Sequence, residues 1–250
     1  MLRVSQVSAL WFSLAVTSAA LGCSGDDGGD GTSGGATGAT TGMVEPPPGG
    51  VFLWTGAGGG GPGTDLYVDE VESLLDGAGV DVASGEALPA DFAGRFGTLV
   101  YMNPTGEFPA EVNAAATALV EAGGRLVLVM EHCKNGCWGN ADGHNALLAA
   151  LGAGMRVAGD GGADLQETEL PVVAAPPLTD GVSTLVVFYS GHVIAGGETV
   201  ALGKIPGGDL VIGFEAIGAG EVVAVTDSSI FGYVLGSGDN SKFVTNLALH

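Results

Sequence analysis

The sequence predicts an α/β fold in which a mostly parallel β-sheet lies between two layers of helices. Between residues 51 and 151, short apolar runs alternate with segments whose apolar residues recur at helical spacing, which is typical of βαβ units. The run at 125–130 is apolar over nearly its whole length, which indicates a strand buried on both faces, as in a parallel sheet. From residue 184 to 216, strand-like runs follow one another without helices and predict an antiparallel β insertion.

The first half of the domain carries the alternating pattern. It opens with a buried strand at 51–54, which runs into a glycine-rich loop at 56–61. Thr64 or Asp65 is suited to cap the helix that follows, because both side chains accept hydrogen bonds from first-turn amides. The other elements expected in this half are strands at 80–82, 98–102 and 125–130, a helix that starts near Pro109, and a helix at 145–151.

The second half changes pattern and then returns to it. Glycine-rich turns separate three strands that we expect to pair antiparallel with one another, at 185–189, 199–202 and 210–214. A further strand at 221–226 resumes the parallel part of the sheet. Asp239 is placed to cap a last helix, whose inward face should hold Phe243, Val244 and Leu247.

The first 22 residues have the features of an export signal. Arg3 gives a short basic start, an apolar run covers 9–16, and small residues follow up to Gly22. The apolar run is too short to span a bilayer as a permanent helix. Ala20-Leu21-Gly22-Cys23 resembles the lipobox of bacterial lipoproteins, which implies cleavage before Cys23 and attachment of lipid to it. The alternative is an ordinary secretion signal followed by a chance cysteine.

The sequence therefore divides into a signal peptide at 1–22, a tether at 23–50 and an α/β domain at 51–250. The tether is rich in Gly, Ser, Thr and Asp and has too few apolar side chains to fold, so we expect a flexible coil that spans about 30 Å. Lipid on Cys23 would make the membrane a partner and hold the domain in the periplasm or at the cell surface. The residue directly after Cys23 is Ser24 rather than Asp, and in this the chain resembles lipoproteins that are sent to the outer membrane.

Composition indicates a folded and strongly acidic domain. Hydrophobic residues make up 46% of the chain and charged residues 14%, which is enough apolar material for a core. The 28 acidic and seven basic side chains give a formal net charge of −21, so a surface for nucleic acid phosphates or anionic lipid is not expected. The chain has no EF-hand loop, and the 56–61 loop lacks the Gly-Lys-Ser/Thr of a P-loop. We expect no cofactor or metal, and a partner that is a protein, a small molecule or a glycan.

The three cysteines become informative once Cys23 is assigned to lipid. Cys133 and Cys137 then form an even pair in an oxidising compartment, and the three residues between them permit a disulfide-closed loop. One alternative makes Cys133 a nucleophile, although the adjacent His132 should point to the opposite side, so that His144 or His192 would have to approach. Another alternative is a zinc site formed by these cysteines with His132 and His144, a spacing that matches no standard zinc pattern.

Polar residues directly after the predicted strands are the candidate ligand-binding residues. Ligands of open α/β sheets bind beyond the carboxyl ends of the strands. Besides the 56–61 loop, that rule selects Asn103, Glu131, His132, Asp227 and Ser228. The alternative is that these side chains satisfy the backbone of the loops in which they lie.

Two groups of residues resemble the class I glutamine amidotransferase-like superfamily. The first is the segment 123–132 followed by 145–152, and the second is the strand at 222–226 followed by Asp227-Ser228-Ser229-Ile230-Phe231 and by 239–247. The second group looks like the non-catalytic branch, which includes domains of intraflagellar transport proteins and of gliding-motility transporter accessory proteins. The resemblance implies a flavodoxin-like or amidotransferase-like three-layer sandwich.

The sequence departs from the catalytic members of that superfamily. Their Gly-x-Cys-x-Gly elbow and His-x-Glu partners have no match, since Glu131 and Asn135 stand where the elbow glycines flanking Cys133 should be. We therefore expect a membrane-anchored lipoprotein whose domain binds a ligand or partner without catalysis. The alternatives are a cysteine-dependent hydrolase that uses Cys133, and a carbohydrate-binding or carbohydrate-processing module that uses Trp138 and the acidic strand ends.

Overall fold

A computed structural model describes residues 49–58, 66–134 and 136–249. The predicted signal peptide, Cys23, nearly all of the tether and the greater part of the 56–61 loop lie outside these residues. Within them, no helix is long and apolar enough to cross a membrane.

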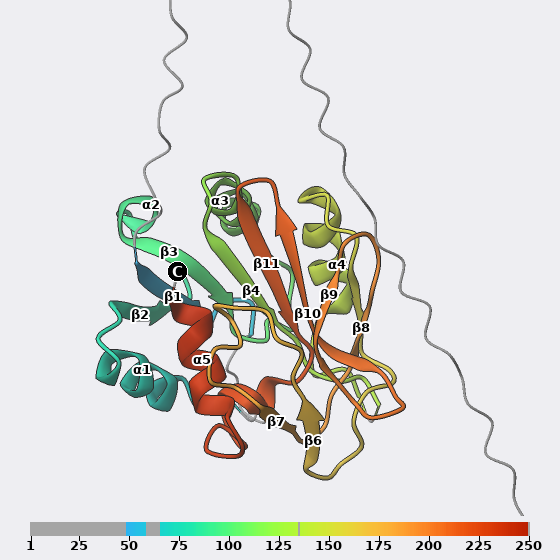
Figure 1. Ribbon diagram of the computed structural model, residues 1–250. Helices are drawn as coiled ribbons and strands as arrows, with labels where there is room; N and C mark the ends of the chain where they lie inside the picture. Colours follow the sequence, from blue (N-terminus) through green and yellow to red (C-terminus); the bar gives the residue numbers. More distant parts are fainter. Residues whose placement is uncertain (1–48, 59–65, 135, 250) are drawn as a thin grey trace, which may run out of the picture. The chain divides into compact units, whose positions relative to one another are not determined.

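Five strands form the parallel part of a nine-stranded sheet, as the alternating pattern predicts (Figure 1). Their order is β2-β1-β3-β4-β11, and each neighbouring pair is parallel. All residues of β1, β3 and β4 are buried, which explains their continuous apolar sequences. The five strands are β1 (Gly50–Trp54), β2 (Val82–Gly85), β3 (Phe96–Tyr101), β4 (Arg125–Val129) and β11 (Gly220–Val225).

Beyond β11 the sheet becomes antiparallel. β10 pairs with β11 along its length, and β9 and β8 both pair with β10, while β5 lies at the edge beside β8. These strands are β5 (Arg156–Ala158), β8 (His192–Ile194), β9 (Val200–Lys204) and β10 (Leu210–Ile217).

The predicted strand at 185–189 has a partner that the sequence reading missed. It forms β7 (Thr184–Val187), which pairs antiparallel with β6 (Thr168–Pro171) in a separate two-stranded sheet. Of the three runs expected to pair antiparallel, this one therefore pairs outside the group, whereas the runs at 199–202 and 210–214, which form β9 and β10, pair with each other as expected. The strand β6 contains only one buried residue, Leu170, so its sequence has no apolar pattern that would predict a strand there.

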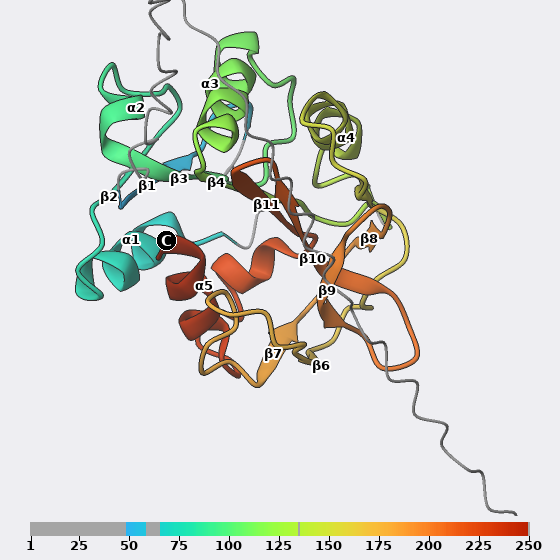
Figure 2. The same ribbon diagram turned by 45° about the horizontal axis from the view of Figure 1, so that its top comes forward.

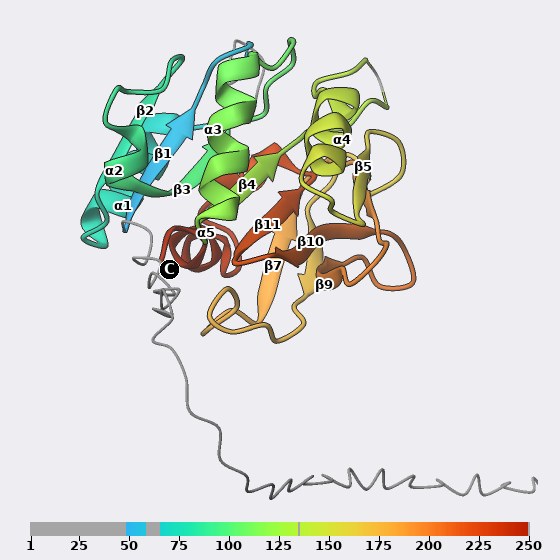
Figure 3. The same ribbon diagram turned by 90° about the horizontal axis from the view of Figure 1, so that it is seen from above.

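Helices cover both faces of the sheet and complete three layers (Figure 2). α1 and α5 pack on one face, where their apolar side chains meet alternate strand residues such as Val51 and Val127. α3 and α4 pack on the other face, against the intervening residues such as Phe52 and Leu126, and lie side by side across it (Figure 3). The helices are α1 (Val68–Gly77), α2 (Phe92–Arg95), α3 (Ala110–Glu121), α4 (Ala141–Ala150) and α5 (Asn240–Ala248).

Two predicted helix starts differ from the structure. α1 begins at Val68 with Tyr67 at the N-cap position, so Thr64 and Asp65, which lie outside the described residues, precede the cap. α4 begins at Ala141, four residues before the predicted start, because Asn140 Oδ1 accepts a hydrogen bond from Gly143 N and caps the first turn.

Asp239 occupies the predicted N-cap position of α5 but bonds a different segment. Its carboxylate accepts hydrogen bonds from Ser183 N and Oγ and from Thr184 N, which ties α5 to the start of β7. These donors lower the pKa of Asp239 below its usual value. The predicted inward face is confirmed, since Phe243, Val244 and Leu247 are buried.

Candidate functional site

The predicted polar residues gather at the carboxyl edge of the parallel strands. Asn103 follows β3, Glu131 and His132 follow β4, and Asp227 and Ser228 follow β11. Because β3, β4 and β11 are consecutive in the sheet, these residues come from adjacent strand ends. All five residues are at most 7% exposed. The polar side chains that the sequence predicts at this edge of the sheet are therefore buried and do not lie on the surface.

Glu131 joins the ends of two neighbouring strands. Ser228 Oγ donates a hydrogen bond of 2.5 Å to Glu131 Oε2, and His132 N donates one of 2.9 Å to Oε1. Glu131 is 7% exposed, and these donors replace the hydrogen bonds that its carboxyl oxygens would form with water. The structure therefore brings Glu131, His132 and Ser228 together.

The His132 imidazole is engaged on both sides. Its ring lies against that of Tyr189 with centroids 3.5 Å apart, and Nδ1 accepts a hydrogen bond of 3.2 Å from Lys134 N. Burial and the nearby Lys134 charge lower the pKa of His132 to about 4. Its Nε2 lies 4.0 Å from Glu131 Oε1, and because the lowered pKa leaves the His132 imidazole neutral at neutral pH, the two side chains do not form an ion pair there.

Asp227 and Asn103 hold backbone segments. Asp227 Oδ2 accepts from Phe188 N at 2.7 Å, and Oδ1 accepts from Ser229 N at 2.8 Å at the start of a short 3-10 helix, Ser228–Phe231. Asn103, in the left-handed backbone region at φ 50°, donates from Nδ2 to Trp138 O at 2.9 Å. Both side chains therefore form hydrogen bonds with backbone groups of loops. The sequence analysis gives this role as the alternative to ligand binding.

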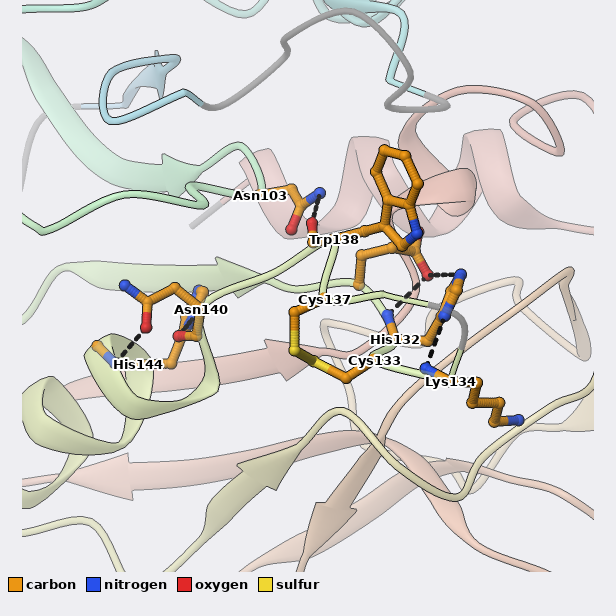
Figure 4. The surroundings of a disulfide bond; sticks show 10 residues. Asn103, His132, Cys133, Lys134, Cys137, Trp138, Asn140 and His144 are labelled. Carbon is orange, nitrogen blue, oxygen red and sulfur yellow. Dashed lines mark hydrogen bonds and ion pairs between the residues drawn. A yellow bond between two sulfur atoms is a disulfide. The ribbon is translucent and has the colours of Figure 1, made fainter.

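Cys133 and Cys137 form a disulfide, as the cysteine count predicts (Figure 4). The bond closes a short loop after β4, and the Cα atoms are 3.9 Å apart. Cys133 N donates to Gly159 O at 2.6 Å. A Cβ on Gly159 would lie 2.4 Å from Cys133 Sγ, so the close approach of this segment to the disulfide requires glycine.

The two histidines that could have served Cys133 are bonded elsewhere. His144 is fully buried on α4, where its Nδ1 lies 2.7 Å from Asn140 O and its ring contacts that of Phe108. His192 Nδ1 contacts Asp160 O. In the described part of the chain, no group of three or more His, Cys, Asp or Glu residues could hold a metal ion, so the predicted alternative of a zinc site finds no support there.

A cavity of about 390 Å³ opens beside the disulfide, and we call it the disulfide cavity. Of the predicted site residues, Cys133 and Cys137 line it. The others are Thr105, Gly106, Glu107, Gly139, Asn140, Ala141 and Asp142, from the segment after β3 and from the start of α4. The sequence analysis does not predict these seven residues. Two signals could have indicated some of them: Asn140 is a residue type that often caps helices, and Thr105 lies in the loop after a strand.

The chain matches the model of one protein family and is similar in fold to several solved structures. The model of the family described as "Domain of unknown function (DUF4350)" matches residues 69–248. No curated protein matches the chain in sequence.

Similar solved structures include the mmIFT52 N-terminal domain, with a TM-score of 0.61 at 14% identity over 80% of this chain and 98% of that one. A cytoplasmic protein from Salmonella typhimurium LT2 has a TM-score of 0.56 at 16% identity, covering 79% of this chain and 97% of its own. A ThuA-like protein from Bacteroides uniformis has a TM-score of 0.50 at 12% identity, covering 80% and 90%. The likeness shows an amidotransferase-like fold, as the sequence predicts, and no function.

Proposed function

The chain belongs to the DUF4350 family, and from this premise we propose that it is an exported, lipid-anchored protein whose amidotransferase-like domain binds a ligand or partner without catalysis. The observation that carries the proposal is the Cys133–Cys137 disulfide. A cysteine nucleophile attacks as its thiolate, and a sulfur held in a disulfide has none to offer. The chain has only three cysteines, and Cys23 is the third.

The surroundings of Cys133 also favour binding over catalysis. A general base is most effective when its pKa lies near the working pH, whereas the pKa of His132 is lowered to about 4. The His132 Nδ1 atom already accepts a hydrogen bond from Lys134 N, and the Glu131 carboxylate accepts from Ser228 and His132. These contacts stabilise the strand ends and leave Cys133 without an activated partner.

Export and lipidation rest on the N-terminal segment. The export signal and Ala20-Leu21-Gly22-Cys23 support cleavage before Cys23 and lipid attachment, with the outer membrane as the favoured destination. A disulfide in the domain supports the same proposal, because disulfides persist in oxidising compartments such as the periplasm. Two acyl chains or more would give a stable anchor, whereas one binds only marginally.

A pair of assays tests the proposal. The full chain is expressed in a bacterial host with labelled palmitate, and we expect label in the wild type but not in Cys23→Ala. Purified protein is then given glutamine and glutaminyl peptides, with and without dithiothreitol, beside Cys133→Ala. We expect no hydrolysis above that of the variant. Hydrolysis that reduction raises and Cys133→Ala abolishes would establish a cysteine-dependent hydrolase instead.

A further inference from the structure

The Cys133–Cys137 disulfide is open to solvent on one side. Cys137 is exposed and Cys133 is partly buried, and both residues line the disulfide cavity of about 390 Å³. The two sulfurs are not equally covered, because the Gly159 backbone packs so closely against Cys133 Sγ that a Cβ there would lie 2.4 Å from it. External thiols reduce exposed disulfides more readily than buried structural ones. Cys137 is therefore the cysteine that a thiol in the cavity would reach.

The disulfide joins residues that other hydrogen bonds already hold together. Trp138 N donates a hydrogen bond of 3.1 Å to His132 O, so the residues that flank the two cysteines are bonded directly across the loop. Asn103 Nδ2 donates to Trp138 O at 2.9 Å (Figure 4). Cys133 N donates to Gly159 O at 2.6 Å. Since none of these bonds involves a sulfur atom, reduction should leave the two thiols side by side in a folded domain.

A disulfide of this kind stabilises a fold less than most disulfides do. Cys133 and Cys137 are only four positions apart. In the chain-entropy model the stabilisation grows with the length of the closed loop, so a loop this short gains least. The disulfide also links no two elements of the fold, because the loop that it closes lies wholly between β4 and α4. Stability alone is therefore a weak reason for a cysteine pair at this cavity.

The start of α4 lies at the same cavity and favours a thiolate there. Asn140, Ala141 and Asp142 line the cavity together with both cysteines. Amides in the first turn of a helix have no acceptor within the helix, and their partial positive charge stabilises a thiolate nearby. The carboxylates of Glu107 and Asp142 have the opposite effect, but both residues are exposed, so solvent screens their charge.

We propose that the Cys133–Cys137 disulfide is a thiol-exchange site, which accepts two electrons from a dithiol that enters the disulfide cavity. One thiolate of the dithiol attacks Cys137 Sγ, forms a mixed disulfide with it and breaks its bond to Cys133 Sγ, which leaves as a thiolate. The second thiol of the dithiol loses its proton and attacks the first sulfur of the dithiol, so that Cys137 Sγ leaves as a thiolate. The dithiol departs as a disulfide, and the two cysteines take up the two protons that it lost. This activity goes beyond the proposed binding function and does not depend on it.

The test follows reduction of the disulfide by dithiothreitol, a neutral dithiol. The full chain carries Cys23→Ala, so that Cys133 and Cys137 are its only cysteines. Alkylation and mass spectrometry count the thiols over time, and a peptide of residues 131–139 with the same disulfide is the fully accessible reference. We expect a rate within about tenfold of that of the peptide, an unchanged circular dichroism spectrum, and re-formation of the bond by oxidised glutathione. Reduction that is slower than this, or that needs urea, would overturn the proposal.

Two matched substitutions test whether the dithiol enters through the cavity. Glu107→Trp places a large side chain in the cavity, and Glu121→Trp makes the same change in charge and size at the end of α3, away from it. We expect Glu107→Trp to slow reduction at least about tenfold and Glu121→Trp to change it less than about twofold. Equal rates in two variants that both keep the circular dichroism of the folded domain would overturn entry through the cavity.

The single-cysteine variants test which sulfur is attacked. In the same Cys23→Ala chain, Cys133→Ser keeps the thiol of Cys137, and Cys137→Ser keeps that of Cys133. The neutral disulfide 4,4′-dithiodipyridine should react with Cys133→Ser at least about tenfold faster, because Cys137 is the more exposed cysteine. Equal rates, or the reverse order, would contradict attack at Cys137. Hydrolysis of glutaminyl substrates tests the proposed function separately, since thiol exchange hydrolyses no such bond.

Discussion

Ser228 Oγ donates a 2.5 Å hydrogen bond to Glu131 Oε2 and so fastens the carboxyl end of β11 to that of β4. Both residues are at most 7% exposed, so the carboxylate depends on protein donors in place of water. The strand ends that frame the candidate site are therefore stabilised by a side-chain pair as well as by the sheet.

Removing the Ser228 hydroxyl should destabilise the domain. Ser228→Ala leaves Glu131 Oε2 without this donor, and loss of one partner of a buried charged group costs about 1–3 kcal/mol of unfolding free energy. Urea unfolding followed by circular dichroism measures the change. Ser84→Ala, at an exposed position of β2, is the matched control and should have little effect. Equal changes in both variants would mean that the hydrogen bond does not stabilise the folded state.

The disulfide should add stability although its loop is short. Cys133 and Cys137 are four positions apart, and in the chain-entropy model a loop of that length stabilises by about 2 kcal/mol. We expect Cys133→Ser combined with Cys137→Ser to lower the unfolding free energy by about this amount. Dithiothreitol should lower that of the wild type equally and leave the double variant unchanged. A response of the double variant to dithiothreitol would show that the reagent acts elsewhere.

Arg125 should be the most costly of these side chains to replace. Its guanidinium, 1% exposed, donates from Nη1 to the carbonyl oxygens of Asn246, Leu247 and Leu249 at 2.7–3.0 Å and pairs with Glu221. It thereby bonds the end of α5 to the start of β4. Burial lowers the pKa of Arg125, while Glu221 acts in the opposite direction.

The measurement for Arg125 is again the unfolding free energy. Arg125→Gln leaves Glu221 and the carbonyls of α5 without their donor, and breaking such a pair costs about 3–5 kcal/mol. Arg95→Gln is the control, because Arg95 forms an exposed ion pair with Asp81 that solvent screens. We expect the control to lose only a small part of what Arg125→Gln loses, and similar losses would contradict the assignment.

The sequence predicted the parts of the fold whose signal is local. β4 was found because Leu126 to Val129 are apolar and buried, and α5 because Phe243, Val244 and Leu247 repeat at helical spacing. β5, β6 and β8 are three or four residues long and carry no such pattern. Their positions follow from pairing with distant strands, which the chain's own periodicity does not encode.

The sequence predicts only part of the candidate site, because only the residues near strand ends have a local signal. The rule for strand ends predicts Glu131 and Ser228, because each lies within three residues of the carboxyl end of a strand, β4 or β11. It did not find the disulfide cavity, which forms where the segment of Glu107 meets the start of α4 at Asp142. That meeting depends on the tertiary bond from Asn140 Nδ2 to Gly106 O at 2.7 Å, and no residue pattern signals it.

His144 should make the domain less stable in mild acid. It is fully buried, and burial lowers its pKa from 6.5 to about 4, which outweighs its bonds to backbone carbonyls. Because the folded-state pKa lies below the unfolded one, the unfolded chain binds a proton between about pH 6.5 and 4 that the folded chain does not. The unfolding free energy therefore falls as the pH falls through this window, by about 3 kcal/mol in all.

His144→Gln removes the titrating group but keeps a donor for Asn140 O, so its unfolding free energy should depend less on pH than that of the wild type. Urea unfolding at steps from pH 7.5 to about pH 4 measures the slope for each protein. The pKa of His132 is lowered in the same direction, so His132→Gln should flatten the curve further when it is added. Ser84→Ala, the exposed β2 variant used above, carries no titrating group and is the control, with an unchanged slope expected. A wild-type slope that His144→Gln leaves intact would show that other groups, such as the buried carboxyls, set the acid sensitivity.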